Sequence, residues 1–175
     1  LWAYLLGGLS LAAGAWFAHR LFLRLAPNKA TAALLTGLLC AVEWHLVWAA
    51  ASGMETIFFT ALSLALVEYF YSQMAMRRSP QGPASVQKEQ SMVSAVGIGL
   101  LGGLLVLTRP EGLVLAGMVT LGLMILPRPT DRGRLLSRLV ATGLCLLAFA
   151  VVLAPYLAFN LRAVGAIFPH TFYAT

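Results

Sequence analysis

The chain has 175 residues, of which 60% are hydrophobic and only 10% are charged, with a net charge of +6. A soluble domain carries roughly 25% charged residues and needs a polar shell around its core, so this composition excludes a soluble globular domain. It also excludes a disordered segment and a secreted disulfide scaffold, since the chain is rich in apolar residues and has two cysteines. We therefore predict an all-α, polytopic transmembrane helical bundle that forms a single domain over residues 1–175.

Six apolar stretches are predicted to form the transmembrane helices. They lie at about residues 2–18, 30–51, 54–71, 92–107, 112–126 and 139–158. A helix needs about 20 residues to cross a bilayer, so we expect the fourth and fifth stretches to extend into the flanking loops. The second and third stretches are parted only by the turn-like residues 51–53, which indicates a helical hairpin.

The positive charges predict how this bundle lies in the membrane. All but two of the 12 Lys and Arg residues fall in the first, third and fifth loops, at 19–29, 72–91 and 127–138. The positive-inside rule places these loops in the cytoplasm and makes 72–91 a cytoplasmic linker. The protein is thus expected to be a multi-pass protein of the cytoplasmic (inner) membrane. Because the basic residues do not line one exposed face, no nucleic-acid partner is expected.

The two remaining basic residues, Arg109 and Arg162, fall on the opposite, extracytoplasmic side. The positive-inside bias disfavours Arg109 in a loop there, so its presence needs a reason. A phosphate group is one, since a guanidinium binds phosphate through two parallel hydrogen bonds. A salt bridge with Glu55 or Glu111 is the alternative.

Glu55 and Glu111 lie at predicted helix starts on the same side. Glu55 lies in the sequence SGMET at 52–56, and Glu111 lies in TRPEG at 108–112. Both sequences fit the capping box, in which a Ser or Thr and a Glu three residues later bond to each other's backbone N–H groups. The alternative is that the two helix starts share one polar cavity that holds a substrate's hydroxyls or phosphate. The two interpretations are compatible.

Two further acidic residues lie within the apolar stretches. Glu43 and His45 are two residues apart and would not share a helix face, so no joint site is expected from them. Glu68 lies near the cytoplasmic end of the third stretch, and we expect it to be solvated or paired. The cysteines show no CxxC spacing and no Cys/His cluster, so no metal site is predicted.

The tail after the sixth stretch mixes polar residues with apolar anchors. It contains Arg162, His170 and Tyr173. This composition predicts an interfacial segment or, alternatively, a loop that closes over a lipid-linked substrate.

Three motifs, taken in order, resemble those of bacterial GT-C membrane glycosyltransferases of the arabinofuranosyltransferase and mannosyltransferase-like type. They are SGMET at 52–56, TRPEG at 108–112 and FPHTFYA at 168–174. The resemblance covers about residues 51–175 and implies a GT-C-like fold. It also implies transfer of a sugar from a polyprenyl-phosphate donor to an extracytoplasmic acceptor, which would be a cell-envelope glycan, a lipid or a protein. Membrane lipids are the other expected partners.

The resemblance also implies roles for individual residues. Arg109 or Arg162 would bind the donor phosphate. Glu55 and Glu111 would orient sugar hydroxyls or, in the alternative, bind a divalent cation.

The third motif and the catalytic acid depart from the family pattern. His170 and Tyr173 would line the donor or acceptor pocket, although the family often has Asn in place of His170. GT-C enzymes carry a catalytic acid in the first extracytoplasmic loop, whereas no residue before Ala30 is acidic here. The catalytic base is therefore expected upstream of Leu1, and the chain is expected to be an internal fragment of a longer protein. The alternative function is a membrane transporter or flippase for a lipid-linked or polar substrate.

Overall fold

The computed structural model describes residues 1–78, 84–125 and 135–164. In these ranges the chain forms seven helices and no strand, which confirms the all-α prediction there. The helices are α1 (Trp2–Leu25), α2 (Ala30–Val42), α3 (Trp44–Ala51), α4 (Glu55–Arg78), α5 (Ala84–Thr108), α6 (Gly112–Ile125) and α7 (Leu135–Val164).

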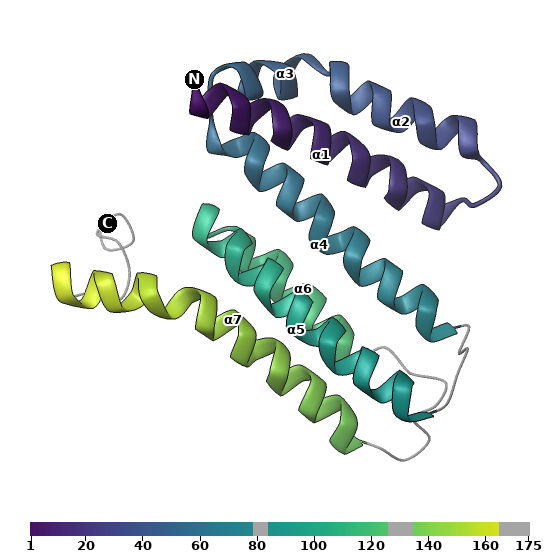
Figure 1. The fold of residues 1–175 in the computed structure, drawn as a ribbon, viewed down its shortest axis with the longest axis vertical. Helices are drawn as coiled ribbons and strands as arrows, with labels where there is room; N and C mark the ends of the chain where they lie inside the picture. The colour runs from purple at the N-terminus through teal and green to yellow at the C-terminus, as the bar shows by residue number, and fades with distance from the viewer. Residues whose placement is uncertain (79–83, 126–134, 165–175) are drawn as a thin grey trace.

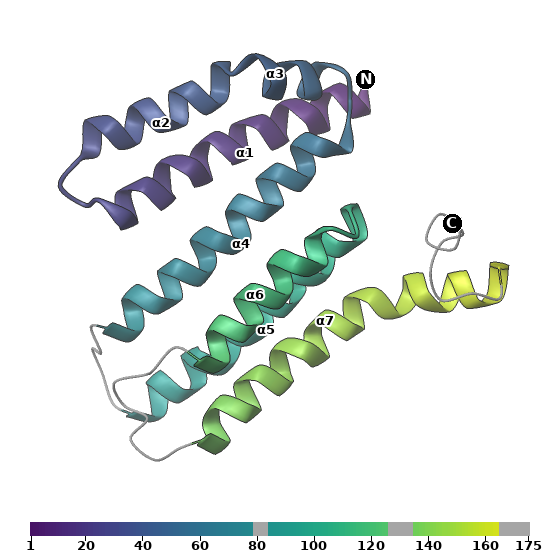
Figure 2. The same cartoon turned by 180° about the vertical axis from the view of Figure 1, so that it is seen from behind.

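The helices lie side by side with their axes roughly along one direction (Figures 1 and 2). α1 packs between α2 and α4, α5 packs against α4 and α7, and α6 packs against α5 and α7. Successive helices run antiparallel when α2 and α3 are counted as one, so their termini gather at two ends. We name these the Glu55 end, where α4 and α6 begin and α3, α5 and α7 finish, and the Arg24 end, where α1, α4 and α6 finish.

Two of these helices contain segments that are long and apolar enough to cross a membrane. They are Glu55–Ala75 in α4 and Arg138–Ala163 in α7. The pair α2 and α3, bent by 48° at Glu43, counts as a third if it forms one broken span. α6 and the Met92–Thr108 part of α5 are apolar but shorter. The described residues thus support two or three spans by length and composition, where the sequence predicted six.

The outside of the bundle is apolar. Large side chains that are more than half exposed include Leu34, Leu38, Met118, Leu147 and Phe159. An extended apolar surface of this kind is typical of a membrane or protein contact face. It follows directly from the composition, because 60% hydrophobic residues cannot all fit inside a bundle of this size.

Small residues let α5 and α7 approach closely. A Cβ atom added at Gly99 would collide with the carbonyl oxygen of Cys145, and one added at Gly103 would lie 2.7 Å from Cβ of Val152. Gly99 and Gly103 are four residues apart and share one face of α5, a spacing that allows tight helix contact.

The first predicted loop is shorter than expected. α1 continues to Leu25, so Arg20 and Arg24 lie in a helix and not in a loop over 19–29. The prediction was wrong because it took charge as a loop signal, although Arg has a high helix propensity.

The predicted linker over 72–91 is also largely helical. α4 continues to Arg78 and α5 begins at Ala84, so the linker prediction is wrong for 72–78 and 84–91. Residues 79–83 lie outside the described part. The same reason applies, since the polar residues of 84–91 are mostly compatible with a helix.

Candidate functional site

The two motifs singled out at 52–56 and 108–112 meet at the Glu55 end. Nη2 of Arg109 donates hydrogen bonds to Oε1 of Glu55 and to Oγ1 of Thr56, each at 2.9 Å. The side chains of Arg109 and Glu55 are 34% and 60% exposed. The sequence left two alternatives for Arg109, phosphate binding and a salt bridge with Glu55 or Glu111, and the described geometry contains the salt bridge with Glu55.

The first motif, residues 52–56, connects the end of α3 to the start of α4. Gly53 has φ +69°, and its N–H donates to the carbonyl of Ala50 while the N–H of Met54 donates to that of Ala49. This pair of bonds is a Schellman motif, which needs a residue in the left-handed conformation directly after the helix. The hydroxyl of Ser52 donates to Ala49 as well, at 3.2 Å. The chain therefore reverses within three residues, and α4 starts at Glu55.

The capping-box interpretation is wrong for both motifs. The hydroxyl of Ser52 bonds backward into α3, and Glu55 is itself the first residue of α4. Thr108 is the last residue of α5, and its hydroxyl donates to the carbonyl of Leu105 at 2.7 Å. In each case the hydroxyl satisfies a carbonyl at a helix end, because a Ser or Thr near a terminus can bond to either neighbouring helix.

The second motif is a tight turn that points Arg109 toward α4. The N–H of Arg109 donates to the carbonyl of Leu105, and the N–H of Gly112 donates to the carbonyl of Arg109. A Cβ atom at Gly112 would lie 2.8 Å from Cγ of Leu105, so only glycine fits where α6 starts against α5. This turn fixes the backbone from which the Arg109 side chain reaches Glu55.

The remaining predicted residues are not brought to this contact. Glu111 lies exposed in the turn, where its carbonyl accepts from the N–H of Val114. Arg162 is exposed in the last turn of α7, beyond Pro155. His170 and Tyr173 lie outside the described residues.

Two contacts were missed by the sequence reasoning. Thr56 was quoted only as part of a motif, yet it accepts a hydrogen bond from Arg109. Glu43 and His45, expected to face apart, lie 2.8 Å from each other between Oε1 and Nδ1. The helix breaks at Glu43, whose other oxygen accepts from the N–H of Leu46 and so caps α3. No Gly or Pro lies at this break. The charged residue Glu43 inside an apolar stretch was the one feature of the sequence that could have indicated it.

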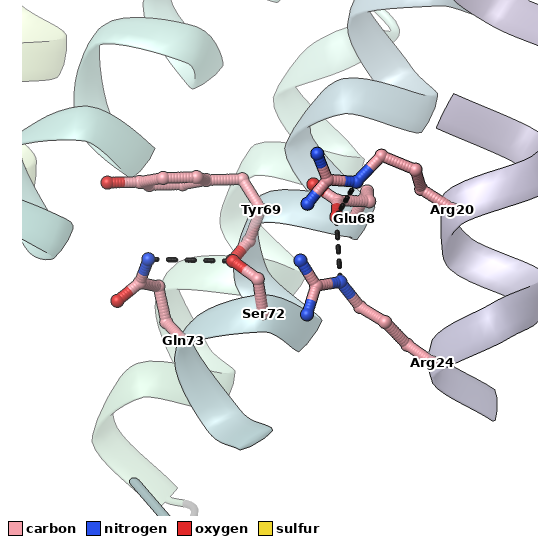
Figure 3. A network of polar contacts seen from close by, with 6 residues as sticks. All are labelled: Arg20, Arg24, Glu68, Tyr69, Ser72 and Gln73. Carbon is pink, nitrogen blue, oxygen red and sulfur yellow. Dashed lines mark hydrogen bonds and ion pairs between the residues drawn. The ribbon is translucent and has the colours of Figure 1, made fainter. Parts of the chain in front are cut away.

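A second ionic cluster lies toward the Arg24 end (Figure 3). Glu68 of α4 is buried, and its Oε1 accepts a hydrogen bond from Nε of Arg24 at 2.7 Å. Nε of Arg20 lies 3.2 Å from the same oxygen. The expectation that Glu68 is paired is confirmed, whereas solvation is not, because its side chain is 7% exposed.

A polar contact between α4 and α5 continues this cluster along α4. Ser72 and Gln73 are buried, the hydroxyl of Ser72 donates to the carbonyl of Tyr69, and Nε2 of Gln73 lies 3.5 Å from Oγ of Ser72 (Figure 3). The hydroxyl of Ser94 on α5 donates to Oε1 of Gln73. Buried polar groups need such partners, so this network helps to fix α4 relative to α5.

Neither cluster provides a metal site among the described residues, where no three His, Cys, Asp or Glu side chains gather. The Glu55 end therefore offers one guanidinium and one carboxylate in contact, both accessible from outside. Such a pair suits recognition of an anionic, hydroxyl-bearing ligand. Comparison of the chain with protein-family models, with curated proteins and with solved structures finds no match.

Proposed function

We propose that the chain is part of a GT-C-type membrane glycosyltransferase that transfers a sugar from a polyprenyl-phosphate donor to an extracytoplasmic acceptor. The observation that carries the proposal is the contact between Arg109 and Glu55. These residues come from two motifs of the resemblance and lie 54 positions apart in the sequence. In this proposal the helices form a multi-pass bundle in the cytoplasmic membrane, with the Glu55 end on the extracytoplasmic side.

Arg109 would stabilise the lipid phosphate as it leaves. Its Nη2 binds Glu55 and Thr56, and no other described residue accepts a hydrogen bond from its side chain. Nε and Nη1 are therefore left to donate single hydrogen bonds to phosphate oxygens, because each two-bonded fork of a guanidinium includes Nη2. A hydrogen-bond donor that is already in place where negative charge develops on the leaving phosphate lowers the barrier to sugar transfer.

Glu55 would both position Arg109 and contact the sugar. Its Oε1 accepts from Arg109, which holds the guanidinium in one orientation. Its second oxygen is available to accept a hydrogen bond from a sugar hydroxyl. Glu111, exposed in the adjacent turn, would add a second carboxylate, while Arg162, His170 and Tyr173 would complete the pocket from the tail.

The reaction has a simple balance of bonds. The acceptor hydroxyl oxygen bonds to the anomeric carbon, and the bond from that carbon to the phosphate oxygen breaks. The polyprenyl phosphate leaves with the electron pair, and the hydroxyl proton passes to a general base. We assign this base to none of the described residues.

Replacement of Arg109 tests the proposal. The full-length protein is reconstituted in liposomes with a labelled polyprenyl-phosphate sugar. Arg109→Ala should lower the rate of sugar transfer by about 100-fold or more, which is the effect of removing one preorganised hydrogen-bond donor from an enzyme active site. Lys29→Gln removes an exposed positive charge from the opposite end and serves as the matched control, with transfer retained. Wild-type turnover by a normally expressed Arg109→Ala protein would remove Arg109 from the site.

One observation favours a transporter or flippase as the second candidate. α2 and α3 form a broken helix with the ionisable pair Glu43 and His45 at the break, and broken helices carry substrate and ion sites in many transporters. Both side chains are well exposed, at 44% and 88%, and bond to each other. Movement of intact labelled donor across the bilayer, without sugar release, would select this alternative.

A further inference from the structure

We propose that the Arg24 end carries a binding site for a phosphate group, formed by Arg20 and Arg24 on α1. The site goes beyond the proposed transferase reaction and lies at the opposite end of the bundle. It shares with the proposed function only the assumption that the bundle lies in a membrane.

The first argument is an excess of positive charge around a buried carboxylate. Arg20 and Arg24 are four residues apart, share one face of α1 and both approach Oε1 of Glu68 through Nε. Two guanidinium groups therefore meet one carboxylate, which leaves one positive charge uncompensated among the described residues of the cluster. No other described residue accepts a hydrogen bond from either guanidinium, so their terminal amino groups remain as donors for a second anion.

The second argument is access. The side chains of Arg20 and Arg24 are 44% and 24% exposed, although that of Glu68 is buried. They line an open depression of about 390 Å³ along one face of α1, together with Trp16, His19 and Leu23. The carboxylate thus holds the two guanidinium groups from beneath while the depression leaves them open to a ligand.

The third argument concerns the chemistry of the ligand. Two adjacent guanidinium groups each present a planar fork of donors, and together these forks match the oxygens of a phosphate better than those of a single carboxylate or a halide. Trp16 is 58% exposed and lies eight residues before Arg24, about 12 Å toward the middle of the helix. A phospholipid can place its phosphate against the two arginines and its acyl chain along Trp16 and Leu23, so that it contacts both the charged and the apolar part of the depression. Free phosphate contacts the arginines alone.

Arg20→Gln is the informative variant. It removes the surplus charge and leaves the closer contact between Arg24 and Glu68 in place, so the buried carboxylate keeps a partner. The full-length protein in detergent is titrated with dioctanoyl phosphatidate, and bound lipid is counted by native mass spectrometry. We expect binding about tenfold weaker than in the wild type, the effect of losing one charged hydrogen-bond donor.

The controls separate the site from general charge and from the transferase. Lys29→Gln, an equal change of charge near the same end, should bind the lipid as the wild type does. Arg109→Ala should do so as well, so the two proposals fail independently. Wild-type binding by Arg20→Gln, or equal weakening by Lys29→Gln, would overturn the site.

Two further arms complete the test. Inorganic phosphate that displaces the lipid from the wild type at millimolar concentration, and raises the melting temperature only while Arg20 is present, would assign the site to soluble phosphate in place of a headgroup. If Arg20→Gln fails to fold, Arg20→Lys keeps the charge but not the planar fork. Several-fold weaker binding by Arg20→Lys supports the site, and unchanged binding contradicts it.

Discussion

The two ends of the bundle each join distant segments through Arg and Glu, but they do so in different surroundings. At the Glu55 end, one arginine meets one exposed glutamate, and the arginine comes from a turn. At the Arg24 end, two arginines meet one buried glutamate, and all three lie within helices. The same residue types therefore form an accessible pair in one place and a structural anchor with surplus charge in the other.

This difference has an energetic meaning. An exposed ion pair contributes little to stability, because water and salt screen it and both side chains lose freedom. Stability therefore does not explain why Arg109 and Glu55 are held together by two tight turns. A buried carboxylate is costly without a partner, so Glu68 needs at least one of the two arginines, of which Arg24 makes the closer contact.

The largest effect on stability is expected at the Arg24 end. Glu68→Gln removes the carboxylate that both arginines contact and should lower the free energy of unfolding by about 2 kcal/mol, the order of a hydrogen bond to a charged group, since the two arginines are partly exposed and can be hydrated. Denaturation of the purified protein in mixed detergent micelles measures this change.

Glu55→Gln is the matched variant at the other end. It makes the same chemical change in an exposed pair, so stability should change little while transfer falls. Equal losses of stability for the two variants would contradict the distinction between the ends.

A smaller effect is expected from the turn that positions Glu55. Gly53 has φ +69°, so Gly53→Ala places a Cβ in the left-handed region and should cost about 1 kcal/mol of stability. Transfer should fall as well, because Glu55 follows two residues later. Gly8→Ala is the control, since an added Cβ there meets no atom within 4 Å. Full transfer by Gly53→Ala would show that this turn does not position the site.

Much of the fold follows from the sequence, because long apolar stretches must form helices and short polar gaps must form turns. The positions of Glu55 and Arg109 at one end follow from alternation of those turns. The partners of single side chains do not follow. Ser52 lies between two helices, and only the backbone geometry decides that its hydroxyl serves α3.

The ionic cluster at the Arg24 end shows a second limit of sequence reasoning. The sequence analysis placed Arg20 and Arg24 in a cytoplasmic loop over 19–29, and Glu68 near the cytoplasmic end of the third apolar stretch. Their contact depends on α1 continuing to Leu25 and packing against α4, which is a property of tertiary structure. The break at Glu43 shows the same limit, since nothing local in the sequence requires it.

The measurement that tests the central claim most directly is a double-mutant cycle on sugar transfer. The full-length wild type, Glu55→Gln, Arg109→Ala and the double variant are compared with one labelled polyprenyl-phosphate donor in liposomes. If the two residues form one site, the loss in the double variant is smaller than the product of the two single losses, because each depends on the other. Transfer unaffected by Arg109→Ala, or losses that multiply independently, would contradict a site shared by Glu55 and Arg109.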